Sequence, residues 1–164
     1  MSASYLLLML GQLAVAVLLG AISAYLSIVL FDRATQNIEE WEEIKKGNAA
    51  IGIVLGAMVV AVAWMLHPTL KMPITSWDVG AARIVIALGV QAAQLLIGLI
   101  LAVFAILFSL WLFDRLTTHL DEWAELKRGN VSVAAMLAGV IMSIAVLVGV
   151  VLENIFQLVV PYLF

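Results

Sequence analysis

Four long apolar runs, separated by short polar stretches, make up most of the chain. They cover Tyr5–Phe31, Ala49–Leu66, Ile84–Phe113 and Val131–Leu152. About 20 helical residues cross a hydrocarbon core that is roughly 30 Å thick. The pattern therefore predicts four transmembrane helices. The first and third runs are longer than the bilayer requires, so we expect them to tilt or to project beyond it.

Composition supports a lipid environment. The chain has 164 residues, of which 65% are hydrophobic and 12% charged, and its mean hydropathy is +1.17. A soluble domain is about half apolar and a quarter charged, so this chain has too few polar residues to cover a water-exposed surface. The net charge of −3 argues against a nucleic-acid partner. The chain has no cysteine, which excludes disulfides and thiolate metal sites. The lipid bilayer is the first partner that the sequence predicts.

The polar stretch Leu30–Asn48 recurs as Leu112–Asn130, 82 residues later. The two copies, LFDRATQNIEEWEEIKKGN and LFDRLTTHLDEWAELKRGN, are identical at 11 of 19 positions. Chance similarity between apolar helices would not reproduce a polar segment so closely. The chain is therefore a tandem duplication of a two-helix hairpin.

The duplication predicts an all-α membrane protein with four transmembrane helices, arranged as two parallel repeats of a two-helix hairpin. The first repeat covers residues 1–70 and the second covers 84–164, with an extracytoplasmic connection at 71–83. Because each repeat has an even number of spans, both should point the same way and be related by a pseudo-twofold axis along the membrane normal. A short amphipathic helix should precede helices two and four.

Basic residues predict the orientation. Six of the eight lysines and arginines lie in the two repeated loops, and only Lys71 and Arg83 lie in the middle connection. The positive-inside rule therefore places both repeated loops in the cytoplasm and both termini outside a cytoplasmic (inner) membrane.

Apolar residues recur every three or four positions in each repeated loop, as in Ile38, Trp41 and Ile44. This spacing predicts a short amphipathic helix at the membrane interface. Its acidic side has two interpretations, a solvated face or a docking surface for a basic or cationic partner. The docking surface would consist of Glu39, Glu40, Trp41, Glu43, Asp121, Glu122, Trp123 and Glu125.

Four amides recur at the offset of 82 residues, at the start of an apolar run or inside one. Asn48 and Asn130 follow glycines, where they could cap the next helix, and Gln12 and Gln94 lie inside helices one and three. The glutamines could form interhelical hydrogen bonds or line a polar path through an oligomer. Each asparagine also heads a stripe of small residues that could pack closely against another helix: Gly52 and Gly56 after Asn48, and Ala134 and Ala138 after Asn130.

The remaining polar residues predict no chemistry. Arg83 and Glu153 should lie at the same outer level and could form an ion pair. No ionisable residue lies near a helix centre, which argues against proton coupling. His67 and His119 are isolated and lie in loops. We find no catalytic motif, so we expect no enzyme activity and no cofactor or metal.

The segments EIKKGNAAIGIVLG (Glu43–Gly56) and ELKRGNVSVAAMLAG (Glu125–Gly139) resemble the repeated signature of the YjfL-like family of inner-membrane proteins, a domain-of-unknown-function family. The resemblance covers nearly the whole chain. It implies duplicated two-helix units in the cytoplasmic membrane and a loose association with envelope stress. It implies no established activity or catalytic residue.

Two functions remain open from the sequence. The protein could be a structural or interaction component whose acidic cytoplasmic helices dock a cytosolic or membrane partner. Alternatively, it could be a small cation channel or transporter, with the amides lining the path and the acidic loops concentrating cations. Four helices enclose little space, so a pore would need a homo-oligomer, a dimer or larger. The absence of charge within the spans favours the first function or a passive pore, and argues against proton coupling.

Overall fold

The computed structural model describes residues 3–34, 40–70, 81–117 and 121–159. Every regular element in these ranges is a helix: α1 (Ala3–Ala34), α2 (Glu40–Lys45), α3 (Ala49–Leu66), the 3₁₀ turn η1 (His67–Leu70), α4 (Ala81–Leu116), α5 (Glu122–Lys127) and α6 (Val131–Val159). Four of these helices are long and apolar enough to cross a membrane. The predicted all-α fold with four spanning helices is confirmed.

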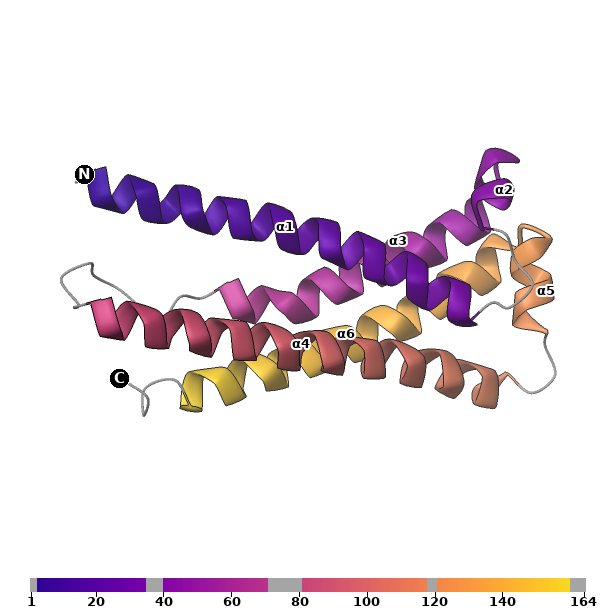
Figure 1. Ribbon diagram of the computed structural model, residues 1–164. Coiled ribbons are helices and arrows are strands. Elements are labelled where there is room, and N and C mark those ends of the chain that lie inside the picture. Colours follow the sequence, from indigo (N-terminus) through magenta and orange to yellow (C-terminus); the bar gives the residue numbers. More distant parts are fainter. Residues whose placement is uncertain (1–2, 35–39, 71–80, 118–120, 160–164) are drawn as a thin grey trace.

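The two hairpins point in the same direction. In Figure 1, α1 and α4 run from one end of the bundle to the other, and α3 and α6 return. The short helices α2 and α5 therefore lie at the same end. At about 1.5 Å per residue, the 32 residues of α1 and the 36 of α4 extend roughly 48 and 54 Å. Both exceed a hydrocarbon core of about 30 Å, as the long apolar runs predicted.

A glycine ends each short helix. Gly47 and Gly129 have φ angles of 82° and 81°, the left-handed conformation that residues with a Cβ rarely adopt. The amide of Gly47 donates to Ile44 O and that of Asn48 to Glu43 O, at 2.9 and 3.0 Å. The second repeat has the same pair of bonds. This arrangement is a Schellman turn. It places the residue after each glycine, Asn48 or Asn130, at the N-cap position of the following helix.

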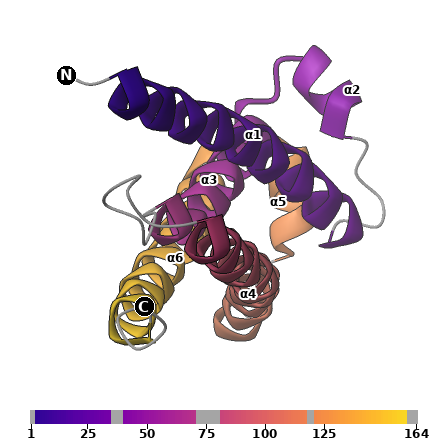
Figure 2. The ribbon, with the colours of Figure 1, turned by 60° about the vertical axis from the view of Figure 1, so that its left-hand side comes forward.

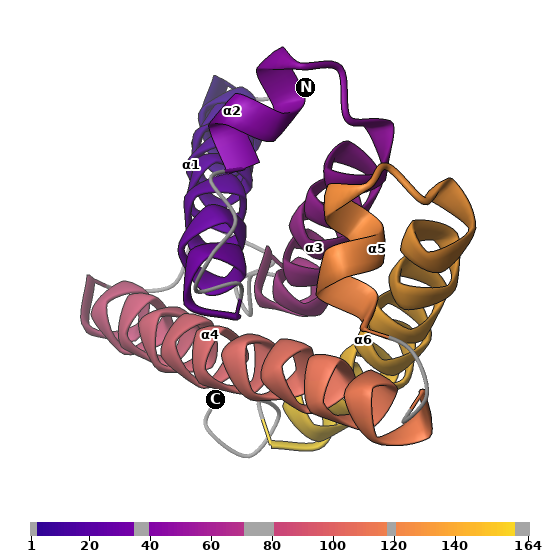
Figure 3. The ribbon, with the colours of Figure 1, turned by 90° about the vertical axis from the view of Figure 1, so that its right-hand side faces the viewer.

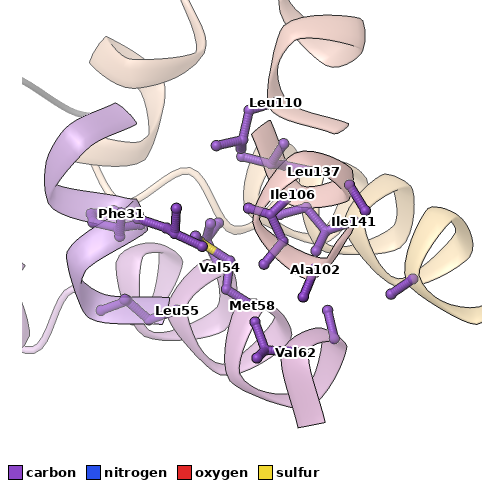
Figure 4. Packing of buried hydrophobic residues seen from close by; sticks show 14 of the residues in the cluster. Phe31, Val54, Leu55, Met58, Val62, Ala102, Ile106, Leu110, Leu137 and Ile141 are labelled. Atoms are coloured by element: carbon purple, nitrogen blue, oxygen red, sulfur yellow. The ribbon is translucent and has the colours of Figure 1, made fainter. Parts of the chain in front are cut away.

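Helix α3 lies at the centre of the bundle. Of the residues in its apolar window 44% are buried, against 22% for the span in α1. Figure 4 shows Met58 and Val62 of α3 facing Ala102 and Ile106 of α4 and Ile141 of α6. Large side chains on the outer sides stay exposed and would face lipid; on α4 they recur every four residues, at Leu96, Ile100 and Phe104.

The two repeats are not packed as a symmetric pair. Helix α3 packs most extensively against its equivalent, α6, and also against α4 and α5 of the second repeat, whereas within the described residues α6 makes no comparable contact with α1 or α2. Figures 2 and 3 show α3 between α1 and α6, while α1 also meets the second repeat at α4 and at Trp123 of α5. The expected pseudo-twofold relation therefore fits the central contact between the equivalent helices α3 and α6 but not the contacts around it, and the parallel direction is correct.

One local cause of this asymmetry is a glycine. A Cβ added to Gly98 of α4 would lie 3.2 Å from Leu66 Cδ2 and 3.4 Å from Thr69 Cγ2. The missing side chain thus lets α4 approach the end of α3. The equivalent residue in α1, 82 positions earlier, is Ala16. Helix α1 therefore has no glycine at the position that would allow an equally close approach to α6.

Candidate functional site at the turns between helices

The repeated glutamate and asparagine form the same local structure twice. Glu43 Oε1 accepts from Lys46 Nζ at 2.9 Å, and its Oε2 accepts from Asn48 Nδ2 at 3.1 Å. The hydrogen bond from Lys46, followed by that from Asn48, lowers the pKa of Glu43. Each donor lies within five residues of the carboxylate, so this structure is encoded locally.

In the second repeat Glu125 takes the same role. Its Oε1 accepts from Arg128 Nη1 at 2.8 Å and its Oε2 from Asn130 Nδ2 at 2.7 Å. Here the asparagine bond is the largest cause that lowers the pKa of Glu125, and the arginine bond comes second. The spacing Glu-x-x-basic-Gly-Asn therefore describes a carboxylate held by a cation on one oxygen and an amide on the other.

Each asparagine also caps the helix that follows it. Asn48 Oδ1 accepts from the amides of Ala50 and Ile51 at 3.1 and 3.4 Å. Asn130 Oδ1 accepts from the equivalent amides of Ser132 and Val133 at the same two distances. An asparagine is required because one side chain must accept from the new helix and donate to the glutamate.

One contact of the turns joins the two repeats. Asn48 Nδ2 donates to Leu126 O at 3.0 Å and to Lys127 O at 3.3 Å, both at the end of α5. Within the described residues Asn130 makes no equivalent bond to α2. The two identical motifs therefore make different contacts. Asn48 in the first repeat bonds to the second repeat, whereas among the described residues Asn130 in the second repeat does not bond to the first repeat.

The two short helices differ in burial because α5 packs against the first repeat, whereas α2 makes no comparable contact with the second repeat within the described residues. Leu126 of α5 is fully buried, and Trp123 packs edge-to-face on Phe31 with ring centroids 6.4 Å apart. In α2 the equivalent side chains are open, with Trp41 57% and Ile44 38% exposed. Figure 3 shows α5 lying across the ends of α3 and α6, while α2 stands apart from α6.

The predicted docking surface needs correction. Glu43 and Glu122 are 8% and 5% exposed, so neither carboxylate can meet a partner. Asp121 is exposed but caps α5, accepting from the amide of Ala124 at 3.0 Å. The sequence pattern missed these roles because it places acidic residues around a helix without showing which side packs. Trp41 stays accessible, Glu39 lies outside the described residues, and the Glu40 side chain is likewise not described.

Glu122, which the sequence placed on the docking surface, is instead a buried acid. Its Oε1 has no hydrogen-bond partner among the described residues. It lines a cavity of about 10 Å³ together with Asp114, between α4, α5 and α6. Burial is the main cause that raises the pKa of Glu122, and the nearby Asp114 and Asp121 raise it further.

The amides at the opposite end are enclosed. Gln94 is 6% exposed, and its Oε1 has no partner in the described part of the chain. Gln91 has no counterpart in the first repeat, where the equivalent residue is Met9, so the repeat did not indicate it. Its Nε2 donates to Thr69 O at 3.2 Å and so satisfies a carbonyl of η1. Gln12 lies on α1, and its side chain is outside the described residues.

The small-residue stripes are used unequally. Ala134 is fully buried and Ala138 is half-buried on α6. Gly52 and Gly56 lie on the exposed side of α3, and a Cβ added to either would meet no described atom within 4 Å. The glycine pair therefore takes no part in a helix contact within the described chain.

The expected ion pair between Arg83 and Glu153 stays a prediction, because the Arg83 side chain is not described. Glu153 accepts a hydrogen bond from Gln157 Nε2 at 3.1 Å. A cleft of about 120 Å³ opens near this level between α1 and α3. Its lining is mostly apolar, and the Ser23 hydroxyl there already donates to Leu19 O at 2.7 Å.

Taken together, four apolar spanning helices and a duplicated helix–turn–helix unit define a multi-pass membrane protein with an internal repeat. The family model described as Domain of Unknown Function (DUF350) matches the chain twice, over residues 5–102 and 87–163. The chain belongs to this family, which confirms the YjfL-like resemblance. Neither the curated proteins nor the solved structures contain a match.

Proposed function

We propose that this protein is an interaction component of the cytoplasmic membrane that docks a protein partner through α2. The docking surface, called the α2 face below, consists of Trp41, Glu42, Ile44 and Lys45. The observation that carries the proposal is the difference between two nearly identical helices. The apolar side of α5 is buried in the bundle, whereas Trp41 and Ile44 of α2 are 57% and 38% exposed.

Elementary energetics support a partner for this face. Burying apolar surface is worth about 25 cal/mol per Å², and α5 shows that this sequence pattern packs well when a surface is offered. The turn after α2 is held in place by Glu43 and Asn48, so α2 is presented in a defined position. A preoriented amphipathic helix can bind with a smaller loss of conformational entropy.

The location follows from charge. Six of the eight basic residues lie in the two repeated loops, which supports a cytoplasmic position for the α2/α5 end and an outside position for both termini. The α2 face would then meet partners at the inner surface of the membrane.

A cation channel is less well supported. Conduction would require the repeated amides to face water, but Asn48 and Asn130 are engaged by glutamate and by helix amides. Gln94 is enclosed, and the cleft between α1 and α3 has a mostly apolar lining.

Site-specific photo-crosslinking tests the proposal. A benzophenone amino acid at position 41 should give a protein adduct of defined mass in membranes, and Ile44→Glu should abolish this adduct. The matched probe at position 123, which packs on Phe31, should crosslink within the chain. Adducts at position 41 that contain only lipid would show that the α2 face rests in the bilayer interface and would overturn the proposal.

A further inference from the structure

The contact between Asn48 and the end of α5, which joins the two repeats, has an equivalent that two copies of the chain could form. We propose that the α2 face binds a second copy of this chain, at the turn around Asn130 and the start of α6, in the way that α5 binds Asn48 and α3 within one chain. This inference rests on the proposed docking role of α2 and names its partner.

The contact within the chain has two halves. The donor half is Asn48 at the start of α3, whose Nδ2 reaches Leu126 O and Lys127 O. The acceptor half is the C-terminal end of α5, where carbonyls without helical partners carry partial negative charge. Leu126, fully buried, supplies apolar packing beside this polar contact.

Each half has an unused counterpart. Asn130 is equivalent to Asn48, and its Nδ2 bonds only to Glu125 within the described residues. Ile44 and Lys45 are equivalent to Leu126 and Lys127 by the offset of 82 residues. Ile44 O accepts from Gly47 N, as Leu126 O does from Gly129 N, and a carbonyl can accept a second bond. Within the described residues the chain therefore has one donor turn, around Asn130, and one acceptor helix, α2, that make no such contact with the other repeat.

The surfaces around these groups are complementary. Next to Asn130, Val131 and Met136 of α6 are 48% and 61% exposed and could cover Ile44 and Trp41 of another copy. Charge agrees as well. Within the chain Lys127 acts favourably on Glu43, and by the same offset Lys45 of a second copy would lie near Glu125.

Donor and acceptor surfaces lie on different repeats, so the contact joins unlike surfaces of two copies. A twofold dimer would make this contact twice, reciprocally, whereas among the described residues of one chain it is made once and not returned. We therefore expect a head-to-tail arrangement, which the double cysteine variant below distinguishes from a doubly linked dimer. Repeating a head-to-tail contact about an axis along the membrane normal adds copies in one rotational sense and closes a ring where the angle allows.

Cysteine crosslinking in the full-length protein tests this inference, because the natural chain has no cysteine. The template pair is Ala49→Cys with Lys127→Cys, on the two sides of the Asn48 contact. The equivalent pair between copies is Lys45→Cys with Val131→Cys. All four positions are exposed. The variants are reconstituted in liposomes at high lipid-to-protein ratio and oxidised with copper phenanthroline.

The template pair should form a disulfide within one chain, visible as a monomer with altered mobility. A mixture of the Lys45→Cys and Val131→Cys single variants should give a dimer band that neither variant gives alone. Asn130→Ser should reduce this band several-fold, whereas Asn48→Ser should not. A double variant with both substitutions should give a ladder of higher species.

Three results would overturn the inference. A template pair that does not close would remove the contact within the chain from which the inference starts. A mixture that stays monomeric while the template pair closes would exclude the copy as partner, and a Lys45→Cys homodimer would indicate a twofold contact instead. The photo-crosslinking probe at position 41 distinguishes failure of this inference from failure of the proposed function. An adduct with a different protein would support docking through α2 and exclude self-association, whereas lipid adducts alone would exclude both.

Discussion

Replacing Asn48 by serine removes the hydrogen bond between the two repeats while keeping the helix cap, because a serine hydroxyl can also accept from the first amides of α3. Asn130→Ser is the matched control. Both substitutions preserve a cap, and both remove an amide that donates to a glutamate. Only the first removes the bond to Leu126 O and Lys127 O. The difference between the two variants therefore isolates the contact between repeats.

The magnitude follows from that single bond. A typical hydrogen bond contributes about 0.5–1.5 kcal/mol net, and the Asn48 amide shares one donor group between two neighbouring carbonyls. We expect Asn48→Ser to lower the free energy of unfolding by about 1 kcal/mol more than Asn130→Ser does. The cap contributions cancel in this comparison, because the cap distances are the same in the two repeats. The bond to glutamate is shorter at Asn130, 2.7 against 3.1 Å, so its loss would add to the cost of Asn130→Ser and would act against the expected difference.

The assay is reversible unfolding by SDS in mixed micelles, followed by tryptophan fluorescence, at a dilution where the protein is monomeric. Dilution matters because the proposed contact between copies would also use Asn130. Equal losses for the two variants, or a larger loss for Asn130→Ser, would refute the reasoning, since the structure gives Asn130 no bond to the other repeat among the described residues.

Two further perturbations test the packing and the charges. A Cβ added to Gly149 would lie 2.8 Å from Trp64 Cδ1, whereas one added to Gly139 would meet nothing within 4 Å. In the same SDS titration we expect Gly149→Ala to lower the free energy of unfolding by about 1–3 kcal/mol through overpacking, with Gly139→Ala as the control. A neutral result for Gly149→Ala would contradict the close approach of α3 and α6. Glu122 and Glu43 should show opposite pH dependence. Burial raises the pKa of Glu122, so folding favours its protonated form, and its stability contribution is present at low pH and lost as pH rises through the raised pKa. Glu122→Gln should therefore be more stable than the natural chain at neutral pH, and the gain should vanish in acid. The hydrogen bond from lysine lowers the pKa of Glu43, so its contribution is present at neutral pH and lost as pH falls through the lowered pKa. Glu43→Gln should accordingly lose stability at neutral pH and little in acid; unfolding curves at several pH values that show the same trend for both variants would sink this explanation.

The features that the sequence determined by itself are local or compositional. The spans follow from apolar runs, because a bilayer requires about 20 apolar residues per helix. The two turns follow from a few neighbouring residues, since the carboxylate of Glu43, the left-handed Gly47 and the capping Asn48 lie within six positions. Interactions that close over so short a segment form wherever the segment occurs. Both copies therefore have the same turn, and the family signature corresponds to it.

The tertiary structure alone decided how the two copies differ. Equivalent residues receive different environments: Leu126 is buried and Ile44 is open. These fates depend on whether a helix from the other repeat lies close by, and that depends on contacts between residues far apart in the chain, such as Gly98 against Leu66. A repeated sequence specifies two equal surfaces, but around the central α3–α6 contact only one of each pair is joined to the other repeat within the described residues: α5 and Asn48 are, whereas α2 and Asn130 are not. That is why the sequence predicted both short helices as docking surfaces and only the packing showed that α2 is the one left open.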